Sequence, residues 1–229
     1  IADIASRLEG PLLVFQPSKE ILQQNFAKLQ SYGIFDCGCY SASVGCKDIN
    51  RITFATIGSV MNHMSDFDCF KNIIIDECHY VNSKAGQYKE FIEAKNRQVV
   101  GLTATPYRLD RAEGGSILKF LTRVRPRIFS KVIYCCQIGE LLSKGYLADL
   151  HYYDLTTLDL RRVRSNSTGA DYDERSLLAE YERSGFYDKL SNTVVKVLQP
   201  KSGIPRKGVL VFTAFTREAL SLIHISEPT

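Results

Sequence analysis

Two adjacent carboxylates, Asp76 and Glu77, directly follow an apolar run, and His79 stands two positions further on. Carboxylate oxygen is the ligand that Mg²⁺ prefers, and proteins hold this ion through one or two acids, waters and substrate phosphates. A second carboxylate beside the first can orient and deprotonate a water molecule. The pair therefore predicts the magnesium-binding and water-activating part of a site that hydrolyses a nucleotide. The alternative is a pair of solvated acids that merely ends a strand.

The segments around these acids alternate between strand and helix patterns. Helices are predicted at Ile1–Glu9 and, after the capping residue Ser18, up to Gln30. Short apolar runs predict strands at Leu12–Phe15, Arg51–Ile57, Asn72–Glu77 and Gln98–Thr105. This alternation favours an α/β fold with a parallel sheet. Such sheets bind ligands at the carboxyl ends of their strands, which is where Asp76 and Glu77 stand.

The second half of the chain carries weaker patterns. The stretch from about Pro106 to Tyr146 is mixed and predicts only one helix, at Gln137–Ser143. Beyond it we expect a strand at Leu150–Leu160, a mainly helical segment at Ser176–Leu198 broken near Gly185, and a last buried strand at Lys207–Phe215. These elements predict most of one α/β domain and the beginning of a second.

Several of these segments, taken in order, resemble the motifs of superfamily 2 helicases, the DEAD/DEAH-box group. DECH and GLTATPYR resemble motifs II and III, LLVFQPSKEILQQN resembles motif Ia, ITFATIGSV resembles the motif that follows it, and KGVLVFTAF resembles motif IV. The subgroup that they resemble most is the bacterial RadD-like DNA helicases, near the motor subunits of restriction enzymes. The resemblance extends from Ile1 to about Ala219. It implies RecA-like domains of the P-loop NTPase type, each a parallel sheet flanked by helices, with ATP and Mg²⁺ as cofactors.

The resemblance also implies roles for individual residues. Asp76 would hold the magnesium ion, directly or through water, and Glu77 would be the general base. His79 would link the nucleotide site to motif III. Within motif III, the hydroxyls on either side of Ala104 would couple hydrolysis to domain motion; these residues are Thr103 and Thr105. The alternative for both threonines is that they are ordinary strand-end residues with good β-propensity.

A nucleic acid is the partner that the resemblance implies. The residues expected to lie against its backbone are Gln16, Pro17, Ser18, Lys19, Thr56 and Ser59. Amides at the start of a helix, as at Ser18, are natural ligands for phosphate, and such binding weakens as salt rises. Ser18 could also be only a helix cap. We expect DNA rather than RNA, although no residue in these segments recognisably reads a 2′-hydroxyl.

One motif of these motors does not occur in the sequence. The loop GxxxxGK[ST], which cradles the β- and γ-phosphates, has no match, and Gly114-Gly115-Ser116 lacks both the lysine and a preceding strand. Family spacing would place the loop just before Ile1 and the arginine finger beyond Thr229. We therefore expect a fragment that does not hydrolyse ATP at a meaningful rate by itself.

The expected domain limits follow from the same spacing. The first RecA-like domain would occupy residues 1–130, a connection 131–149, and the beginning of the second RecA-like domain 150–219. Residues 220–229, with the sequence LSLIHISEPT, look like the translation of a sequencing-library adaptor and would be a non-native tail. The alternative is a genuine helix after the last strand.

The composition fits a cytoplasmic globular protein without a membrane segment. The 229 residues are 45% hydrophobic and 24% charged, with a formal charge of +4, and no apolar run approaches the roughly 18 residues of a membrane helix. This charge is too small to indicate nucleic acid by itself. The basic stretches Arg123–Arg127 and Arg161–Arg164 fit a solvated surface or phosphate contacts equally. The seven cysteines do not match the usual zinc pairs, so we expect free thiols.

Two further interpretations of the whole chain stay open. The motor could serve a restriction system or a phage DNA-remodelling system, which an appended nuclease domain would indicate. The chain could also be a degenerate RecA-like module that binds nucleic acid or a partner without catalysis, which a natural start codon close to Ile1 would support.

Overall fold

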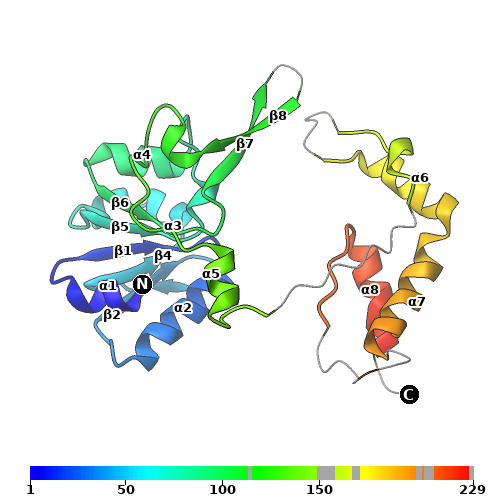
Figure 1. Cartoon of the computed structure of the whole chain (residues 1–229). Coiled ribbons are helices and arrows are strands. Elements are labelled where there is room, and N and C mark those ends of the chain that lie inside the picture. The colour runs from blue at the N-terminus through cyan, green and yellow to red at the C-terminus, as the bar shows by residue number, and fades with distance from the viewer. Residues whose placement is uncertain (113–114, 149–157, 167–170, 200–202, 204–208, 227–229) are drawn as a thin grey trace. The chain divides into compact units, whose positions relative to one another are not determined.

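The computed structural model describes residues 1–112, 115–148, 158–166, 171–199, 203 and 209–226. The chain divides into two compact units, Ile1–Glu140 and Leu141–Thr229 (Figure 1). In the described residues, no helix combines the length and the apolar character that a membrane crossing needs. The domain limits expected at residues 130, 149 and 219 stay a prediction.

A six-stranded sheet forms the centre of the first unit. Across the sheet, its strands are β3 (Cys46–Lys47), β2 (Cys37–Ser41), β4 (Ile52–Ala55), β1 (Leu12–Phe15), β5 (Asn72–Ile75) and β6 (Gln98–Gly101). All neighbouring pairs are parallel except β2 and β3. In the register of the central strand, Leu12 lies opposite both Ile52 and Asn72. The predicted fold class, a mixed α/β structure consistent with a RecA-like fold, is confirmed.

Helices cover both faces of this sheet (Figure 1). One face packs against α1 (Ala2–Arg7) and α2 (Lys19–Ser31), and the other packs against α3 (Ile57–Met61) and α4 (Gln87–Ala94). Successive residues of a strand point to opposite faces. Leu12 and Val14 therefore join the first core, whereas Leu13 and Phe15 join the second. A central strand covered on both faces has to be apolar throughout, as β1 is.

Short elements and a hairpin complete the first unit. The short turns are the 3₁₀ helices η1 (Met64–Phe67), η2 (Cys78–Tyr80) and η3 (Leu121–Arg123). The antiparallel strands β7 (Tyr107–Ala112) and β8 (Gly115–Phe120) form a hairpin that projects from the sheet in Figure 1. The sequence did not predict this hairpin, because charged residues interrupt its apolar ones. The predicted helix at Gln137–Ser143 is confirmed as α5 (Ile138–Ser143).

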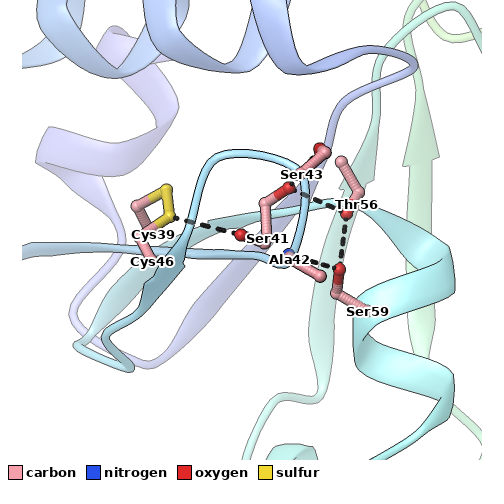
Figure 2. The surroundings of a disulfide bond; sticks show 7 residues. All are labelled: Cys39, Ser41, Ala42, Ser43, Cys46, Thr56 and Ser59. Atoms are coloured by element: carbon pink, nitrogen blue, oxygen red, sulfur yellow. Dashed lines mark hydrogen bonds between the residues drawn. A yellow bond between two sulfur atoms is a disulfide. The ribbon is translucent and has the colours of Figure 1, made fainter.

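The expectation that all cysteines are free is wrong for Cys39 and Cys46, which form a disulfide across β2 and β3 (Figure 2). The antiparallel pairing sets Cys46 opposite Ser41, two residues from Cys39 and on the same face of the strand pair. Their Cα atoms are 5.7 Å apart, within the range that a disulfide spans. The free cysteines are Cys37, Cys69, Cys78, Cys135 and Cys136.

The described elements of the second unit are helices, apart from an isolated bridge between Ser165 and Tyr172. Its elements are η4 (Leu160–Arg162), α6 (Glu174–Ser184), α7 (Phe186–Leu198) and α8 (Thr216–Ser226). The break predicted near Gly185 is confirmed, because Gly185 has φ 62° and ψ 38°, a left-handed conformation that suits glycine. Tyr181 and Phe186 stack across this break with ring centroids 4.1 Å apart.

One predicted strand of the second unit is not found, and the other lies mostly outside the described residues. Most of the strand predicted at Leu150–Leu160 lies outside the described residues, and its end at Leu160 begins η4. Lys207 and Gly208 also lie outside the described residues, and 209–215 form no strand. An apolar run becomes a strand only when another strand pairs with it, and Leu210 and Phe212 are instead exposed. Helix α8 extends into the segment predicted to be a non-native tail.

Candidate functional site

The two carboxylates stand on a sharp turn after β5. The Asp76 amide still continues the sheet, donating to the Phe15 carbonyl at 3.0 Å. Glu77 then adopts φ 49° and ψ 49°, the left-handed conformation that is uncommon for residues other than glycine. This reversal lets the Cys78 amide donate to the Leu102 carbonyl at 2.9 Å and starts η2. Both acids are thereby held at the carboxyl edge of the sheet.

Tight packing under η2 fixes the position of this turn. The Cys78 side chain is only 3% exposed, and its burial raises the pKa of its thiol to about 11. It lies against Gly101, where an added Cβ would come within 2.6 Å of the Cys78 Sγ and 2.7 Å of the Phe129 ring. Only glycine at position 101 leaves room for Cys78 without rearrangement. This contact gives Cys78 a structural role beneath the turn.

An amide bridge connects Asp76 to the middle of α2. The Asp76 Oδ1 accepts from the Glu77 amide at 3.1 Å, and its Oδ2 accepts from Asn25 Nδ2 at 3.3 Å. The same Asn25 nitrogen donates to Gln16 Oε1 at 3.1 Å. Sequence reasoning missed Asn25. The available signal was a polar residue one turn before Leu29, on the side of α2 that packs onto the sheet.

Burial gives Gln16 surroundings that the sequence did not suggest. Its side chain is 1% exposed, and its Nε2 has no hydrogen-bond partner among the described residues. The contact expected between Gln16 and a nucleic acid stays a prediction, and it would require this side chain to become exposed. In the structure, Gln16 belongs to the group around Asp76.

His79 joins the carboxylate turn to the end of β6. Its Nδ1 lies 3.1 Å from Glu77 Oε2 and 2.9 Å from Thr103 Oγ1. A carboxylate can only accept, so the contact with Glu77 needs the proton on Nδ1. Thr103 Oγ1 also accepts from the Thr105 amide at 3.0 Å. The structure thus brings together Glu77, His79 and Thr103, whereas Ala104 and Thr105 are exposed.

The oxygen atoms of Asp76 suit a hard cation. Among the described residues, no group of three or more His, Cys, Asp or Glu side chains converges on one point. Mg²⁺ does not require such a group, since it commonly keeps its waters and uses one or two carboxylates with substrate phosphates. Asp76 is half-buried and accepts two hydrogen bonds from the described residues, which leaves lone pairs for a metal or its waters.

A cluster of hydroxyl groups lies at the ends of β2 and β4 (Figure 2). Thr56 Oγ1 is 2.9 Å from Ser59 Oγ and 3.2 Å from Ser41 Oγ. Ser41 Oγ lies 3.0 Å from Ser43 Oγ. The Ser59 hydroxyl accepts from the Ala42 amide at 2.9 Å. Thr56 and Ser59 come together as the sequence led us to expect, but their hydroxyls already bond to protein groups.

The segment after β1 is more open. Pro17 and Lys19 are exposed, and Ser18 is half-buried. The Ser18 hydroxyl accepts from the Ile21 amide at 3.3 Å, so Ser18 caps α2 as predicted.

In the second unit, Arg161 and Arg162 both bond to Asp159, at 2.9 Å and 3.3 Å. This pairing holds the pKa of Asp159 below its usual range, with the Arg161 hydrogen bond as the main cause, and reduces the charge that this basic stretch could offer to phosphates.

Parallel pairing explains why these groups share one edge. Strands β4, β1, β5 and β6 all run in the same direction, so the residues that follow them meet at the carboxyl edge.

Residues 1–108 match the protein family described as "Type III restriction enzyme, res subunit", a domain of the helicase superfamily 2 N-terminal type. The curated proteins contain no significant match to the chain.

Proposed function

We propose that this chain carries the motif II side of an ATP-driven motor that moves along or separates nucleic acid, with DNA as the substrate. The observation that carries the proposal is the contact of one His79 nitrogen with both Glu77 and Thr103. A general base needs a fixed orientation close to the water that it activates. The match of residues 1–108 to a helicase-type family supports the same activity.

In this proposal each residue of the site has a separate task. Asp76 supplies oxygen to Mg²⁺, and Asn25 holds the Asp76 carboxylate through its side-chain amide. When bound, the metal ion neutralises charge on the phosphates of ATP. Glu77 takes a proton from the attacking water, and the His79 N–H orients the Glu77 carboxylate. Thr103 connects this group to β6, so that a change at the nucleotide can reach the nucleic acid.

The nucleic acid would lie along the segments after β1 and β4. Lys19 is exposed and positively charged, and exposed Pro17 and half-buried Ser18 stand at the start of α2. The hydroxyls of Thr56 and Ser59 would exchange their present partners for phosphate oxygen. Such contacts depend weakly on base sequence and strongly on salt. We place the activity in the cytoplasm, although disulfides such as Cys39–Cys46 are rare in that compartment.

The test is ATP hydrolysis by the complete gene product, measured with and without DNA. Glu77→Gln should lower DNA-stimulated turnover by about 10²-fold or more, because a general base contributes roughly 10²–10⁴. Glu9→Gln, which removes an exposed acid elsewhere in the same unit, should leave turnover unchanged. Equal turnover in the Glu77→Gln protein and the wild type would disprove the assignment. The printed chain alone should show no DNA-stimulated turnover, because it contains no GxxxxGK[ST] string.

A second candidate is the motor subunit of a restriction system. The family that matches residues 1–108, described as a restriction-enzyme subunit, favours it directly. The two candidates differ in what accompanies the motor. A nuclease domain in the complete gene product, together with ATP-dependent cleavage of DNA, would decide for restriction, and strand separation without cleavage would decide for a helicase.

A further inference from the structure

A cavity in the first unit lies next to the candidate site but uses other residues. It has a volume of about 230 Å³, and its walls come from the loop after η2, from the two strands of the projecting hairpin and from the segment after η3. Leu121 and Phe129 supply apolar surface, and Ser83, Lys84, Arg108 and Lys119 supply polar groups. The volume is below the roughly 300–1,000 Å³ of typical small-molecule sites, which suits one chemical group better than a whole nucleotide.

The charge of this cavity has one sign. Three cationic side chains line it, Lys84, Arg108 and Lys119, and no Asp or Glu is among the described residues of its walls. The Arg108 Nη1 donates to the Val81 carbonyl at 2.7 Å, which fixes the guanidinium against the loop. An apolar wall strengthens the attraction between such charges and an anion, because it lowers the local dielectric constant.

A buried hydroxyl in the wall also lacks a partner. Ser83 is 9% exposed, and its Oγ makes no hydrogen bond within the described part of the chain. Buried polar atoms are nearly always paired with protein, water or ligand, and leaving one unpaired costs about 1–3 kcal/mol. A hydroxyl donates well to anionic oxygen. The unpaired hydroxyl and the positive charge therefore both favour a ligand with anionic oxygen atoms.

We propose that this cavity binds a phosphate group of a nucleic-acid backbone, at a contact separate from the segments after β1 and β4. The inference rests on the proposed function, which supplies the nucleic acid. Of the cationic residues that line the cavity, Lys84 is exposed and Arg108 is half-buried. A backbone phosphate that enters here sits beside the hairpin and anchors the nucleic acid next to the motif III end of the sheet.

The test is binding of a fluorescein-labelled 20-nucleotide DNA strand to the full chain, followed by fluorescence anisotropy at several salt concentrations. Lys84→Gln with Lys119→Gln should weaken binding roughly tenfold or more near 0.1 M salt and lower the salt slope by about 0.7, since one phosphate contact to a single strand contributes about that much. Lys71→Gln with Lys95→Gln removes the same charge from residues that precede β5 and β6, at the opposite edge of the sheet. This control should bind as the wild type does.

Ser83→Ala separates a ligand contact from a structural role. Removing a buried hydroxyl that bonds to nothing should leave the melting temperature unchanged or higher, whereas binding of the DNA strand should weaken several-fold. Normal binding by both the Ser83→Ala chain and the double-lysine variant would overturn the inference. So would a double-lysine variant that matches its control.

The source of the phosphate is decided by a second probe. Inorganic phosphate, titrated into wild-type protein by calorimetry, should bind far more weakly than the DNA strand and should compete with it. If phosphate binds tightly but does not compete with the DNA strand, the cavity holds a free anion and the inference is overturned. Failure of the proposed function is visible separately, because it appears as absent DNA binding in the wild type.

Discussion

Two ends of the same sheet edge are built in opposite ways. After β5 and β6, the groups that could do chemistry are half-exposed: the side chains of Glu77 and His79 are 39% and 25% exposed. After β2 and β4, the hydroxyls of Ser41, Thr56 and Ser59 bond to one another or to a backbone amide, and a disulfide closes the hairpin beside them. The first end is ready for a ligand, whereas the second must break protein contacts before it can hold one.

This difference separates two ways of using polar side chains. At the β5 end, close packing and an uncommon backbone conformation hold the acids so that they point outward. At the β2 end, polar groups satisfy each other and stabilise the loop itself. Mutations at the first end should therefore affect activity more than stability, except where they disturb the packing beneath, and mutations at the second end should mainly affect stability.

The largest stability effect is expected where the open end depends on close packing. Gly101→Ala should lower the free energy of unfolding by about 2 kcal/mol, because the new methyl group overlaps Cys78 and the Phe129 ring. The measurement is urea denaturation of the full chain. Gly139→Ala is the matched control, since no atom lies within 4 Å of an added Cβ there. Equal loss in both variants would mean that the contact at Gly101 does not hold the turn.

Opening the disulfide should have an effect of similar size, at the closed end. Cys39→Ala with Cys46→Ala should lower the free energy of unfolding by roughly 2 kcal/mol, as expected for a loop closed over a sequence separation of 7. Melting temperatures with and without dithiothreitol measure this directly. The wild type should respond to the reductant, and the double variant should not. Seven free thiols counted in unfolded, unreduced protein would contradict the disulfide.

A matched pair of hydroxyl deletions compares the two ends directly. Ser59→Ala should cost about 1–2 kcal/mol of stability, because the Ala42 amide loses its acceptor. Thr103→Val should change stability less than DNA-stimulated ATP hydrolysis by the complete gene product, because its hydroxyl contacts His79 at the open end. Denaturation and turnover are measured for both variants. Reversal of this pattern would remove the distinction between the two ends.

The last expected effect is confined to alkaline pH and comes from the buried thiol. The pKa of Cys78 is raised from 9.0 to about 11, mainly by burial. A raised pKa means that the folded state keeps its proton longer than the unfolded state. The contribution to stability is therefore fully present below pH 9 and is lost as the pH rises from 9 to 11. Denaturation between pH 8 and 11 should show a shallower decline in Cys78→Ala than in the wild type, and parallel declines would contradict the assignment.

Much of the sheet could be predicted because local sequence determines it. The runs that form β1, β4, β5 and β6 are short and apolar, and Ser18 marks the start of α2. Strand β2 was missed because its sequence, CGCYS, has little β-propensity. It forms because the chain returns closely beside it: a Cβ at Gly38 would lie 2.5 Å from the Asp48 carbonyl oxygen. This close approach depends on the tertiary structure, so no local sequence pattern predicts it.

The candidate site, like the sheet, could be predicted only in part from the sequence. Asp76, Glu77, His79 and Thr103 follow strands directly, so their order in the chain places them at one edge. Asn25 reaches Asp76 only through the packing of α2 on the sheet, across a separation of 51 residues. The disulfide partner of Cys39 likewise depends on a hairpin that the sequence did not reveal. In both cases the missing information was which residues distant in sequence become neighbours.

The backbone conformation of Glu77 implies a trade-off between stability and function at one residue. A non-glycine residue in the left-handed region typically costs about 1 kcal/mol or more, which glycine or asparagine would largely avoid. Selection for folding alone would favour those residues at position 77. A variant library screened only for thermal stability should therefore enrich glycine or asparagine there, and a screen for DNA-stimulated ATP hydrolysis should return the glutamate. On this expectation, the left-handed conformation of Glu77 is kept for activity, because folding alone does not require a glutamate there.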